Sequence, residues 1–388
     1  MASLLRVPRL LWEVTARGRY EFVYDRIPFV AAGMPAAKRW NLLRSGGNLL
    51  WRRAMAWSLP IHMQVEVVNY CNLQCPVCPT GSGELQREPR AMDPDLFERL
   101  MREVGPYLLT LSLWAWGEPL LHPQLKEILR ACRRYGMATL LSTNGQFLAR
   151  ESVQEALLAE PPAHLIVAVD GLTDETNSHY RKGARLEPLL AGVRLLAEAR
   201  RKRGQRLPVL HMRFLLMRHN EHEVPHVEAF AREHGFDFLS LRTLSICDSE
   251  NPDAVHHGFV PVSANLQAYG YRDAKRIRRD DFYCLEPFWF PTVFADGTLV
   301  ACEQDHQAQQ SLGVFGRDGG FSDLWFSRRA ARIRAELRDR PECYSFCRNC
   351  PYADRPVTDS SIEARVLNPE FTRPLQLTPE TNSRGRRT

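Results

Sequence analysis

Residues 69–79 read Asn-Tyr-Cys-Asn-Leu-Gln-Cys-Pro-Val-Cys-Pro, and this stretch decides how the rest of the chain is interpreted. It places Cys71, Cys75 and Cys78 at a C-x₃-C-x₂-C spacing, directly after residues 62–68, which are typical of a buried strand. A loop leaving a strand can wrap three thiolates around one inorganic centre, because the short spacing keeps the sulfurs close together. Three thiolates on a four-iron cluster leave one iron open to another ligand. The spacing therefore favours an iron–sulfur cluster.

Two other interpretations of the three cysteines stay open. One is a structural zinc loop, although zinc in a closed structural site normally takes four protein ligands and no fourth Cys or His follows locally. The other is three incidental buried cysteines, since free cysteine is common in protein cores.

The bulk composition is that of an ordinary globular protein. At 388 residues, with 44% hydrophobic and 25% charged residues, the chain has room for two domains or for one barrel with additions. No apolar run approaches the ~18–20 residues that cross a bilayer, and Arg6 and Arg9 interrupt the apolar residues near the N-terminus. Ten cysteines indicate metal binding or catalysis more than disulfides. We expect a cytoplasmic protein.

The first sixty residues are strongly basic. Residues 1–60 carry ten Lys or Arg and three Asp or Glu, a net charge of +7 against +6 for the whole chain. They are predicted to form short helical pieces broken at Pro8, Pro28 and Pro35, with aromatic residues between the arginines. Residues 36–57 have apolar and basic faces, which could pack on the rest of the protein, contact a membrane surface or bind an acidic peptide. No nucleic-acid partner is expected.

From residue 61 to about residue 244, strands and helices alternate. Strands are predicted at residues 62–68, 108–114, 138–142, 164–169, 209–216 and 238–244, and helices at 94–104, 123–135, within 186–202 and at 223–234. Asp93 is a good N-cap with Pro94 at the first helical position. Such alternation implies a parallel sheet with right-handed crossovers.

Conspicuous motifs follow the predicted strands. They are Gly117-Glu118-Pro119 after the second strand, Ser142-Thr143-Asn144-Gly145 after the third, and Asp170-Gly171 with Tyr180-Arg181-Lys182-Gly183 after the fourth. Together with the cysteine loop they resemble the radical S-adenosylmethionine (radical SAM) superfamily, over about residues 61–352. The resemblance implies an open, partial (β/α)₆ TIM-like barrel with its chemistry at the carboxyl ends of the strands. It also implies reductive cleavage of S-adenosylmethionine to a 5′-deoxyadenosyl radical that takes hydrogen from a substrate.

The resemblance implies roles for individual residues. Cys71, Cys75 and Cys78 would hold the catalytic 4Fe–4S cluster. The S-adenosylmethionine site would be lined by Gly117, Glu118, Ser142, Asn144, Asp170 and Arg181, and a guanidinium such as that of Arg181 matches a carboxylate in two-pronged geometry. The chain departs from the family pattern at three positions, with Trp116 in place of a glycine, Ala168 in place of a serine and Val77 in place of an aromatic residue.

The composition changes beyond residue 245. Residues 247–281 are predicted to be a linker with one helical piece over 264–279, and Asp296-Gly297 is a hairpin turn that brings Cys284 and Cys302 to neighbouring strand ends. A second C-x₃-C-x₂-C follows at Cys343, Cys347 and Cys350. This region resembles the SPASM and twitch extensions of radical SAM enzymes, with a zinc ribbon as the alternative. Its five cysteines suffice for one auxiliary 4Fe–4S cluster. The expected ligands are Cys284, Cys302, Cys347 and Cys350, and Cys343 is expected to be spare. Cys132 and Cys247, the two remaining cysteines of the chain, are expected to be ordinary thiols.

The sequence thus predicts four regions: a basic helical extension (1–60), a radical SAM partial barrel (61–245), a small β-hairpin and helix domain for the auxiliary cluster (246–355) and a C-terminal tail (356–388). The predicted function is a radical SAM oxidoreductase acting on a peptide or small molecule, with an auxiliary cluster that assists electron transfer. An external electron donor such as flavodoxin or ferredoxin is expected. A zinc-binding interaction protein and a non-catalytic iron–sulfur electron carrier are the alternatives.

Overall fold

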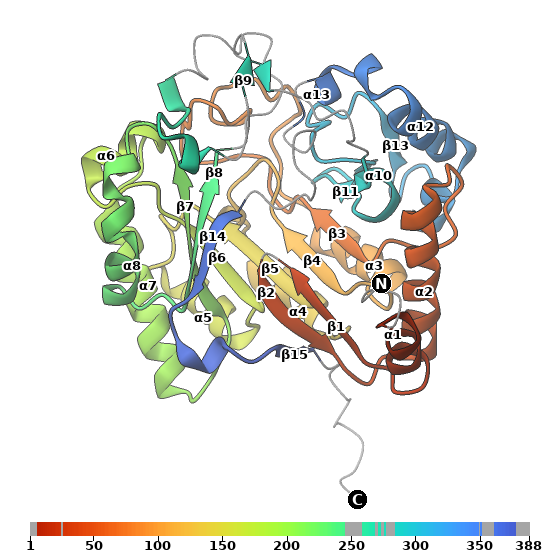
Figure 1. Ribbon diagram of the computed structural model, residues 1–388, viewed down its shortest axis with the longest axis horizontal. Helices are drawn as coiled ribbons and strands as arrows, with labels where there is room; N and C mark the ends of the chain where they lie inside the picture. Colours follow the sequence, from red (N-terminus) through yellow and green to blue (C-terminus); the bar gives the residue numbers. More distant parts are fainter. Residues whose placement is uncertain are drawn as a thin grey trace, which may run out of the picture.

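The structure of the protein is a computed structural model, and it describes residues 6–24, 26–244, 258–267, 271–272, 275–276, 284–348, 350 and 361–377. One sheet organises the molecule, with strands in the order β13-β12-β11-β3-β4-β5-β6-β7-β8-β14. The six strands from β3 to β8 are parallel neighbours in sequence order. Helices cover the outer side of this sheet (Figure 1). The predicted open, partial (β/α)₆ barrel is confirmed.

The barrel elements lie close to their predicted places. The strands are β3 (His62–Val65), β4 (Thr110–Leu113), β5 (Ala138–Thr143), β6 (His164–Ala168), β7 (Val209–Leu216) and β8 (Phe238–Thr243). The helices are α3 (Pro94–Val104), α4 (Leu125–Arg133), α5 (Glu151–Ala159), α6 (Asp174–Tyr180), α7 (Leu186–Lys202) and α8 (Val224–Glu233). Asp93 caps α3 by accepting a hydrogen bond from the backbone N–H of Asp95. The apolar side chains that face the helices, such as Met63, Leu111 and Leu165, are fully buried and form the main core.

The cysteine-rich C-terminal region extends the same sheet. Strand β11 (Thr292–Val293) pairs parallel with β3, then β12 (Thr298–Val300) and β13 (Ser311–Val314) follow antiparallel. The predicted hairpin turn is confirmed, because Gly297 has a φ of 88° and Asp296 accepts a hydrogen bond from Thr298 N–H. The helices of this region are α10 (Glu286–Trp289), α11 (Phe321–Trp325), α12 (Arg328–Asp339) and α13 (Ser345–Arg348).

The helical piece predicted over residues 264–279 is wrong wherever that segment is described. Ala264–Leu266 forms a single 3₁₀ turn, and β9 (Tyr271–Arg272) pairs antiparallel with β10 (Lys275–Arg276). Gly270 lies inside the predicted helix, where glycine costs about 1 kcal/mol relative to alanine, and this disfavours a continuous helix.

The N-terminal region is helical only at its two ends. Helix α1 (Arg6–Thr15) and helix α2 (Ala36–Trp51) flank a hairpin of β1 (Tyr20–Tyr24) and β2 (Ile27–Ala31). The helical pieces predicted around Pro28 are therefore wrong, since Pro28 lies in β2 opposite Val23. The alternation of aromatic residues at 20, 22 and 24 with exposed residues is the strand signal that the prolines obscured.

The N-terminal hairpin packs against the inner face of the barrel sheet. Tyr24 Oη lies 3.0 Å from Ser112 Oγ, and the ring of Phe29 lies 5.8 Å from that of His164. The same cluster contains Leu140 of β5 and Val209 of β7, near the amino ends of their strands. The hairpin therefore closes the amino end of the barrel interior and leaves the carboxyl ends of the strands for the candidate site.

The predicted C-terminal tail contributes two strands to the fold. Strand β14 (Ser361–Val366) pairs antiparallel with β8 and covers that edge of the sheet, and β15 (Leu375–Leu377) pairs parallel with β2. Both segments therefore lie against the barrel (Figure 1).

Candidate cluster and cofactor site

The cysteine loop that follows β3 is fixed by hydrogen bonds at both ends. Asn69 accepts a hydrogen bond from the backbone N–H of Arg90 at 2.6 Å and donates one to the carbonyl of Glu88 at 2.8 Å. Further along, Gln74 N–H donates to the carbonyl of Lys182 at 3.0 Å, which ties the loop to the turn after α6. A Cβ on Gly81 would lie 2.5 Å from the nitrogen of Cys75, so the returning chain needs glycine there.

The three thiols of this loop share one apolar setting. Cys75 is buried, Cys71 and Cys78 are half-buried, and all three pack with Leu73 and Tyr180. Burial raises the pKa of Cys71 to about 11 and that of Cys75 to about 12, and each of these two thiols lies within electrostatic range of the other members of the trio. The structure thus brings the three predicted cluster ligands together in the loop that follows the carboxyl end of β3.

The turn after β4 packs directly on the chain that leads into the cysteine loop. A Cβ on Gly117 would lie 2.0 Å from the carbonyl oxygen of Val68, and Glu118 N–H donates to the carbonyl of Tyr70 at 3.0 Å. Trp116, where the family has glycine, is not among the described residues with positive φ, so this turn does not need glycine at that position. Only Gly117 is fixed by close approach.

Glu118 links this turn to the one after β5. Its buried carboxylate accepts hydrogen bonds from Leu120 N–H at 3.0 Å, Thr143 Oγ1 at 2.6 Å and Asn144 N–H at 2.8 Å. Burial raises the pKa of Glu118 and these donors lower it in part. Glu118 therefore uses its oxygens to position neighbouring backbone. Glu118 lies beside the cysteine loop with its carboxylate engaged by this chain, and its place in the S-adenosylmethionine site stays a prediction.

Asn144 reaches the cysteine loop from β5. Its Nδ2 lies 3.6 Å from Cys71 Sγ and donates to Asn72 Oδ1 at 2.9 Å. Thr143, which the sequence motif did not single out as a site residue, holds this turn by accepting a hydrogen bond from Gly145 N–H at 2.9 Å. Ser142 is half-buried at the end of β5, in register with Ile166 of β6.

Asp170 and Arg181 form a buried ion pair after β6. Arg181 Nε lies 2.6 Å from Asp170 Oδ2, and the other carboxylate oxygen accepts a hydrogen bond from Leu215 N–H at 2.8 Å. Burial raises the pKa of Asp170, and the guanidinium opposes that rise. Among the described residues no side chain or backbone group forms a hydrogen bond with the terminal nitrogens of Arg181. The positive charge of Arg181 acts to lower the pKa of Cys75. The pair thus places a cation with free donors next to the cysteine loop.

Four cysteines of the C-terminal region gather in one buried place. Cys302 and Cys350 are buried and Cys284 is half-buried, and the electrostatic neighbours of Cys284 include both Cys350 and Cys347. Cys343 is exposed to solvent. That these four cysteines, and not Cys343, hold the auxiliary cluster stays a prediction. Cys132 is buried and donates to the carbonyl of Ile128, as an ordinary core thiol does, and Cys247 lies outside the described residues.

A second ion pair, which the sequence did not predict, joins the cysteine-loop strand to the auxiliary region. Arg87 Nη1 and Nη2 donate to the two oxygens of buried Glu66 at 2.6 and 2.7 Å, and Ala295 N–H donates to the same carboxylate at 3.3 Å. Arg87 also donates to the carbonyl of His306 at 2.7 Å. Nearby, Trp116 Nε1 donates to the carbonyl of Glu303 at 3.2 Å. Trp116, which stands where the family has glycine, thus contributes one of the contacts between the barrel and the auxiliary region.

Polar side chains line the inner face of the barrel above the N-terminal hairpin. His62 Nδ1 lies 2.6 Å from Thr110 Oγ1, and burial lowers the pKa of His62 to about 3, so this ring is neutral at neutral pH. Arg213 on β7 pairs in register with Ala168 of β6. Its positive charge acts to lower the pKa of Tyr24, in the N-terminal hairpin, and that of Asp170, after β6. No sequence motif marks Arg213, which lies on the same face of β7 as His211, two residues before it.

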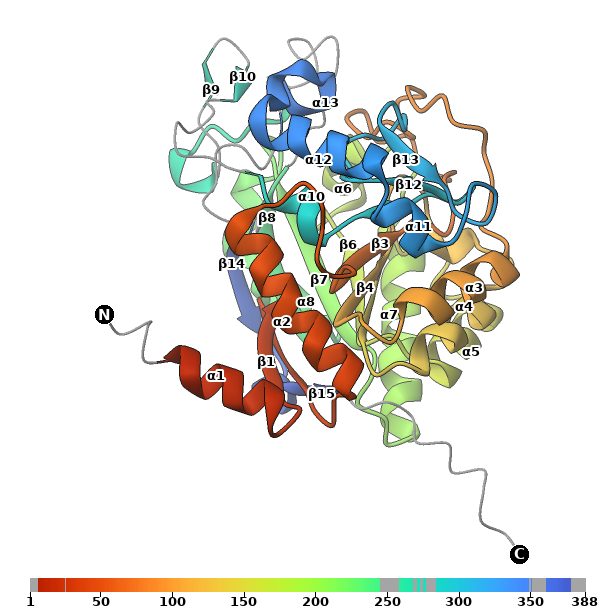
Figure 2. The same cartoon turned by 90° about the vertical axis from the view of Figure 1, so that its right-hand side faces the viewer.

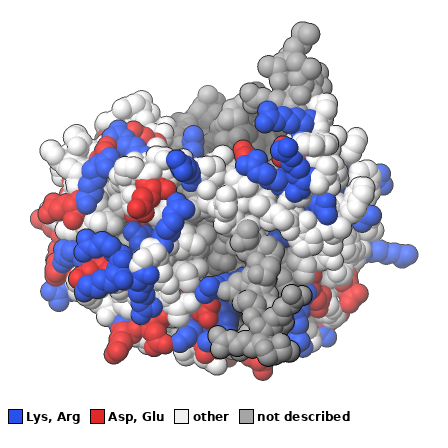
Figure 3. Space-filling model, turned by 90° about the horizontal axis from the view of Figure 1, so that it is seen from below, with Lys and Arg blue, Asp and Glu red and all other residues white. Residues whose placement is uncertain are grey.

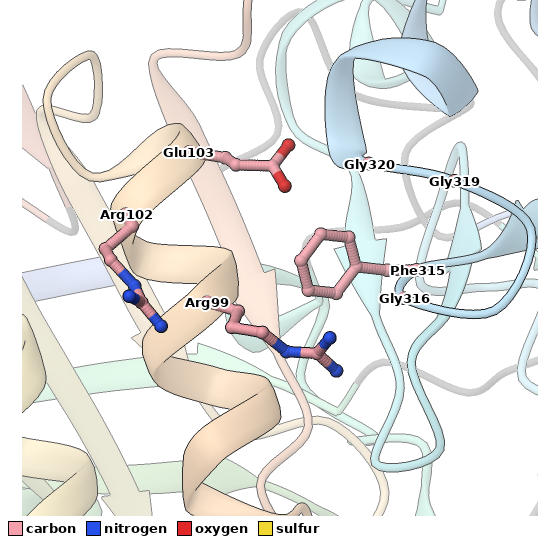
Figure 4. Close-up of a pocket in the computed structure, with 7 residues that line it drawn as sticks. All are labelled: Arg99, Arg102, Glu103, Phe315, Gly316, Gly319 and Gly320. Carbon is pink, nitrogen blue, oxygen red and sulfur yellow. The ribbon is translucent and has the colours of Figure 1, made fainter.

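Two surface hollows lie away from this site. One, of about 490 Å³, sits between α3 and the glycine-rich turn after β13 (Figure 4), where Glu103 accepts a hydrogen bond from Phe321 N–H at 2.7 Å. The other, of about 580 Å³, lies between α7, α8 and the segment after β14. Acidic and basic side chains mix on the lower face of the molecule, on the side where α7 and α8 lie (Figure 3). Neither hollow contains a predicted site residue.

Thiolates are the usual protein ligands of iron–sulfur clusters, and both candidate donor sets consist of cysteine alone. Within the described ranges no three Cys, His, Asp or Glu side chains converge as ligands of one metal ion would. The fit therefore rests on chemistry and burial: two groups of thiols, each in an apolar setting, one with three members and one with four.

Comparison with known proteins agrees with this chemistry. The sequence model of the radical SAM superfamily matches residues 65–231, and that of the SPASM iron–sulfur cluster-binding domain matches residues 284–351. The tungsten-containing aldehyde ferredoxin oxidoreductase cofactor-modifying protein of Pyrococcus furiosus is 26% identical over 328 residues, covering 76% of this chain and 88% of that protein. A PqqA peptide cyclase of Xanthomonas campestris is 29% identical over 318 residues, covering 75% and 79%.

Solved structures share the fold. Streptococcus suis SuiB bound to its precursor peptide SuiA has a TM-score of 0.55 at 17% identity, covering 81% of this chain and 75% of SuiB. The enzyme anSMEcpe with bound AdoMet has a TM-score of 0.50 at 16% identity, covering 80% and 94%. The chain therefore belongs to the radical SAM superfamily, whose enzymes use a 4Fe–4S cluster and S-adenosylmethionine, and carries a C-terminal SPASM domain of the kind that binds auxiliary iron–sulfur clusters.

Proposed function

We propose that this enzyme removes a hydrogen atom from a peptide, and that its own residues divide into three working groups. Cys71, Cys75 and Cys78 hold the catalytic cluster. Gly117, Glu118, Ser142, Asn144, Asp170 and Arg181 form the S-adenosylmethionine site. Cys284, Cys302, Cys347 and Cys350 hold one auxiliary cluster. The observation that carries the proposal is the convergence of the cysteine loop, Asn144 and the Asp170–Arg181 pair, from separate strand ends.

Each polar group has a defined task in this scheme. The terminal nitrogens of Arg181 supply donors for a carboxylate, and Asp170 holds the guanidinium in place through the 2.6 Å contact. Asn144 orients the loop through Asn72 and Cys71, and Glu118 fixes the backbone of Asn144. Gly117 allows the turn after β4 to lie directly on the chain before Cys71. These contacts position and shield the site, and the hard chemistry belongs to the cofactors.

The cluster held by Cys71, Cys75 and Cys78, with S-adenosylmethionine bound beside it and one electron from a flavodoxin or ferredoxin, would supply the radical chemistry that removes the hydrogen atom. Four thiolates leave the auxiliary site coordinatively closed, which suits acceptance of one electron from the substrate radical and not binding of substrate. Glu66, Arg87 and Trp116 hold the auxiliary region against the cysteine-loop strand.

A peptide is the favoured substrate because of two relatives and one structural feature. PqqA peptide cyclase and peptide-bound SuiB are named for action on, or binding of, a peptide. Among the described residues the N-terminal hairpin covers the amino end of the barrel, which leaves the carboxyl ends of the strands for a substrate as long as a peptide. A small-molecule substrate remains the alternative, since another relative is named as a cofactor-modifying protein.

The test begins with anaerobic purification, iron and sulfide analysis, and assay of 5′-deoxyadenosine with dithionite and S-adenosylmethionine. Replacing Cys71, Cys75 and Cys78 together with alanine should abolish 5′-deoxyadenosine and remove about half of the iron. Cys132→Ala is the matched control and should keep both, because this thiol packs in the core of α4. Cleavage that persists in the triple variant would overturn the proposal, as would a colourless zinc protein or an iron protein that never cleaves S-adenosylmethionine.

The substrate class is tested separately with deuterated short peptides encoded next to this gene. Deuterium should appear in 5′-deoxyadenosine. If no peptide transfers deuterium while a small molecule does, the peptide assignment is wrong and the reaction class stands.

A further inference from the structure

On helix α2 (Ala36–Trp51) most of the buried side chains are polar and most of the large exposed ones are apolar, the opposite of an ordinary surface helix. The side turned toward the protein carries Lys38, Asn41, Ser45 and Asn48, and all four are buried. Lys38 donates to the carbonyl of Tyr135 at 3.1 Å, Asn41 bonds both backbone groups of Leu59, and Asn48 donates to Ser58 Oγ at 2.7 Å. The helix is therefore docked through hydrogen bonds of buried polar side chains, together with the apolar packing of Leu42.

The opposite side of α2 is apolar and faces outward. Trp40, Leu50 and Trp51 are 62%, 78% and 63% exposed. At 3.6 residues per turn these three residues, together with Gly47, fall on one stripe along the helix. The ring of Trp57 lies against Gly47 and 5.6 Å from that of Trp51, which widens the stripe into an aromatic surface.

Helix α1 (Arg6–Thr15) adds a second apolar surface beside the first. Its residues Val7, Leu10, Leu11 and Trp12 are exposed, and of its apolar stripe only Val14 is buried in the protein. Among the described residues, ten of the twelve large apolar side chains that stand exposed lie between residues 7 and 57. Figure 2 shows α1 and α2 together on the side of the molecule that faces the viewer. We define the outward sides of α1 and α2 with Trp57 as the N-terminal face.

Basic side chains are interleaved with the apolar ones on the N-terminal face. Arg9, Arg44 and Arg53 are exposed there, and Arg53 lies over the ring of Trp57 at 4.7 Å. The first sixty residues carry ten Lys or Arg and three Asp or Glu. Neither surface hollow described above is lined by any of these residues.

We propose that the N-terminal face binds the surface of an anionic lipid bilayer and holds the enzyme there as a peripheral protein. Tryptophan and leucine on an amphipathic helix, flanked by arginine, suit the boundary between headgroups and acyl chains. A bilayer adapts to projecting side chains, whereas a protein partner would need a groove shaped to receive them. No helix among the described residues could span a membrane, so the contact is interfacial. The net positive charge supplies attraction to anionic headgroups.

Vesicle sedimentation with the full-length, cluster-loaded protein tests this proposal. Vesicles of phosphatidylcholine with phosphatidylglycerol should bind it at least about tenfold more tightly than phosphatidylcholine alone, and added salt should weaken the binding. The double variant Trp40→Ser with Trp51→Ser should lose about tenfold or more in affinity. Arg44→Gln should lose about fivefold on anionic vesicles and little on neutral ones.

The matched control is Leu195→Ser on α7, an apolar side chain outside this face that is 49% exposed, and this variant should bind vesicles like the parent. All these variants change exposed side chains, so each should keep the parent's circular dichroism and its yield of 5′-deoxyadenosine. The proposal is overturned if the parent does not bind anionic vesicles at low salt, or if the double variant binds as well as the parent. It is equally overturned if the double variant abolishes only self-association or capture of a protein, with no vesicle binding by the parent.

Discussion

Replacing Arg87 with methionine should destabilise the joint between the barrel and the auxiliary region. In the parent, Arg87 donates two short hydrogen bonds to Glu66, whose side chain is 0% exposed, while that of Arg87 is 11% exposed. The guanidinium also stacks 3.8 Å over the ring of Phe294. The variant leaves the Glu66 carboxylate with backbone donors alone, of which Ala295 N–H lies at 3.3 Å.

The expected cost follows from this geometry. Removing one partner of a buried ion pair costs about 3–5 kcal/mol of folding free energy, because the remaining charge is buried without compensation. The double variant Glu66→Met with Arg87→Met should recover most of that loss, since no charge is then left buried. Arg90→Met is the matched control. Its ion pair with Glu88 is on the surface, with side chains 44% and 80% exposed, and should cost under about 1 kcal/mol.

The pH dependence gives a second signature with a definite sign. Burial raises the pKa of Glu66 and Arg87 lowers it, so the Arg87→Met variant should have a Glu66 pKa that is raised further. An acid whose pKa is higher in the folded state stabilises the fold below its unfolded pKa, and that stability is lost as pH rises through the folded pKa. The penalty of Arg87→Met should therefore be larger in mildly alkaline than in mildly acidic buffer.

Urea unfolding followed by circular dichroism, with the cluster absorbance recorded in parallel, measures these differences. A variant within about 0.5 kcal/mol of the parent would refute the reasoning, because that is the range of neutral surface changes. A penalty that grows on acidification would refute the electrostatic account even if the total loss were as expected.

Two further predictions concern the cluster and cofactor sites. Cys343→Ala should keep the parent's iron and sulfide content because Cys343 is exposed, whereas alanine at Cys284, Cys302, Cys347 or Cys350 should each lose or destabilise the auxiliary cluster; loss of iron in Cys343→Ala alone would reverse the assignment. Glu118→Ala should lower the free energy of unfolding by about 1–3 kcal/mol for each buried group left unpaired, and should weaken S-adenosylmethionine binding measured by equilibrium dialysis. Retained stability would show that water replaces the carboxylate.

The parallel barrel could be predicted because its signals are local. Each strand is a short apolar run, and the start of helix α3 is marked by Asp93 at the N-cap and Pro94 at the first helical position. Helix α5 was missed although it lies between two predicted strands, and it begins without a capping side chain. The N-terminal hairpin was missed because Pro28 was taken as a helix breaker, while tertiary contact with the inner face of the sheet decides the outcome there.

The candidate site also contains parts that local sequence patterns predict and parts that they do not. The cysteine loop and the strand-end motifs are contiguous in sequence, and parallel strands bring their carboxyl ends together, so their meeting could be predicted. The Glu66–Arg87 pair could not, because Glu66 meets Ala295 across 229 residues and no local pattern records that pairing. Arg213 was hidden for another reason: an arginine on a strand gives no sign of which face it occupies until its neighbours are known.

The N-terminal region connects the proposed catalytic and lipid-binding functions through its attachments. Hydrogen bonds to Tyr135 and Leu59 fix α2 to the barrel, and Trp325 Nε1 donates to the carbonyl of Ser58 from the auxiliary region at 2.8 Å. Because these bonds do not use the outward residues, polar side chains at Trp40 and Trp51 would leave the docking intact. The docking of α2 therefore does not depend on the outward side chains of Trp40 and Leu50. Ser58 lies four residues before β3, the strand that leads into the cysteine loop, so a bilayer bound at α2 would set the orientation of the catalytic site relative to the membrane.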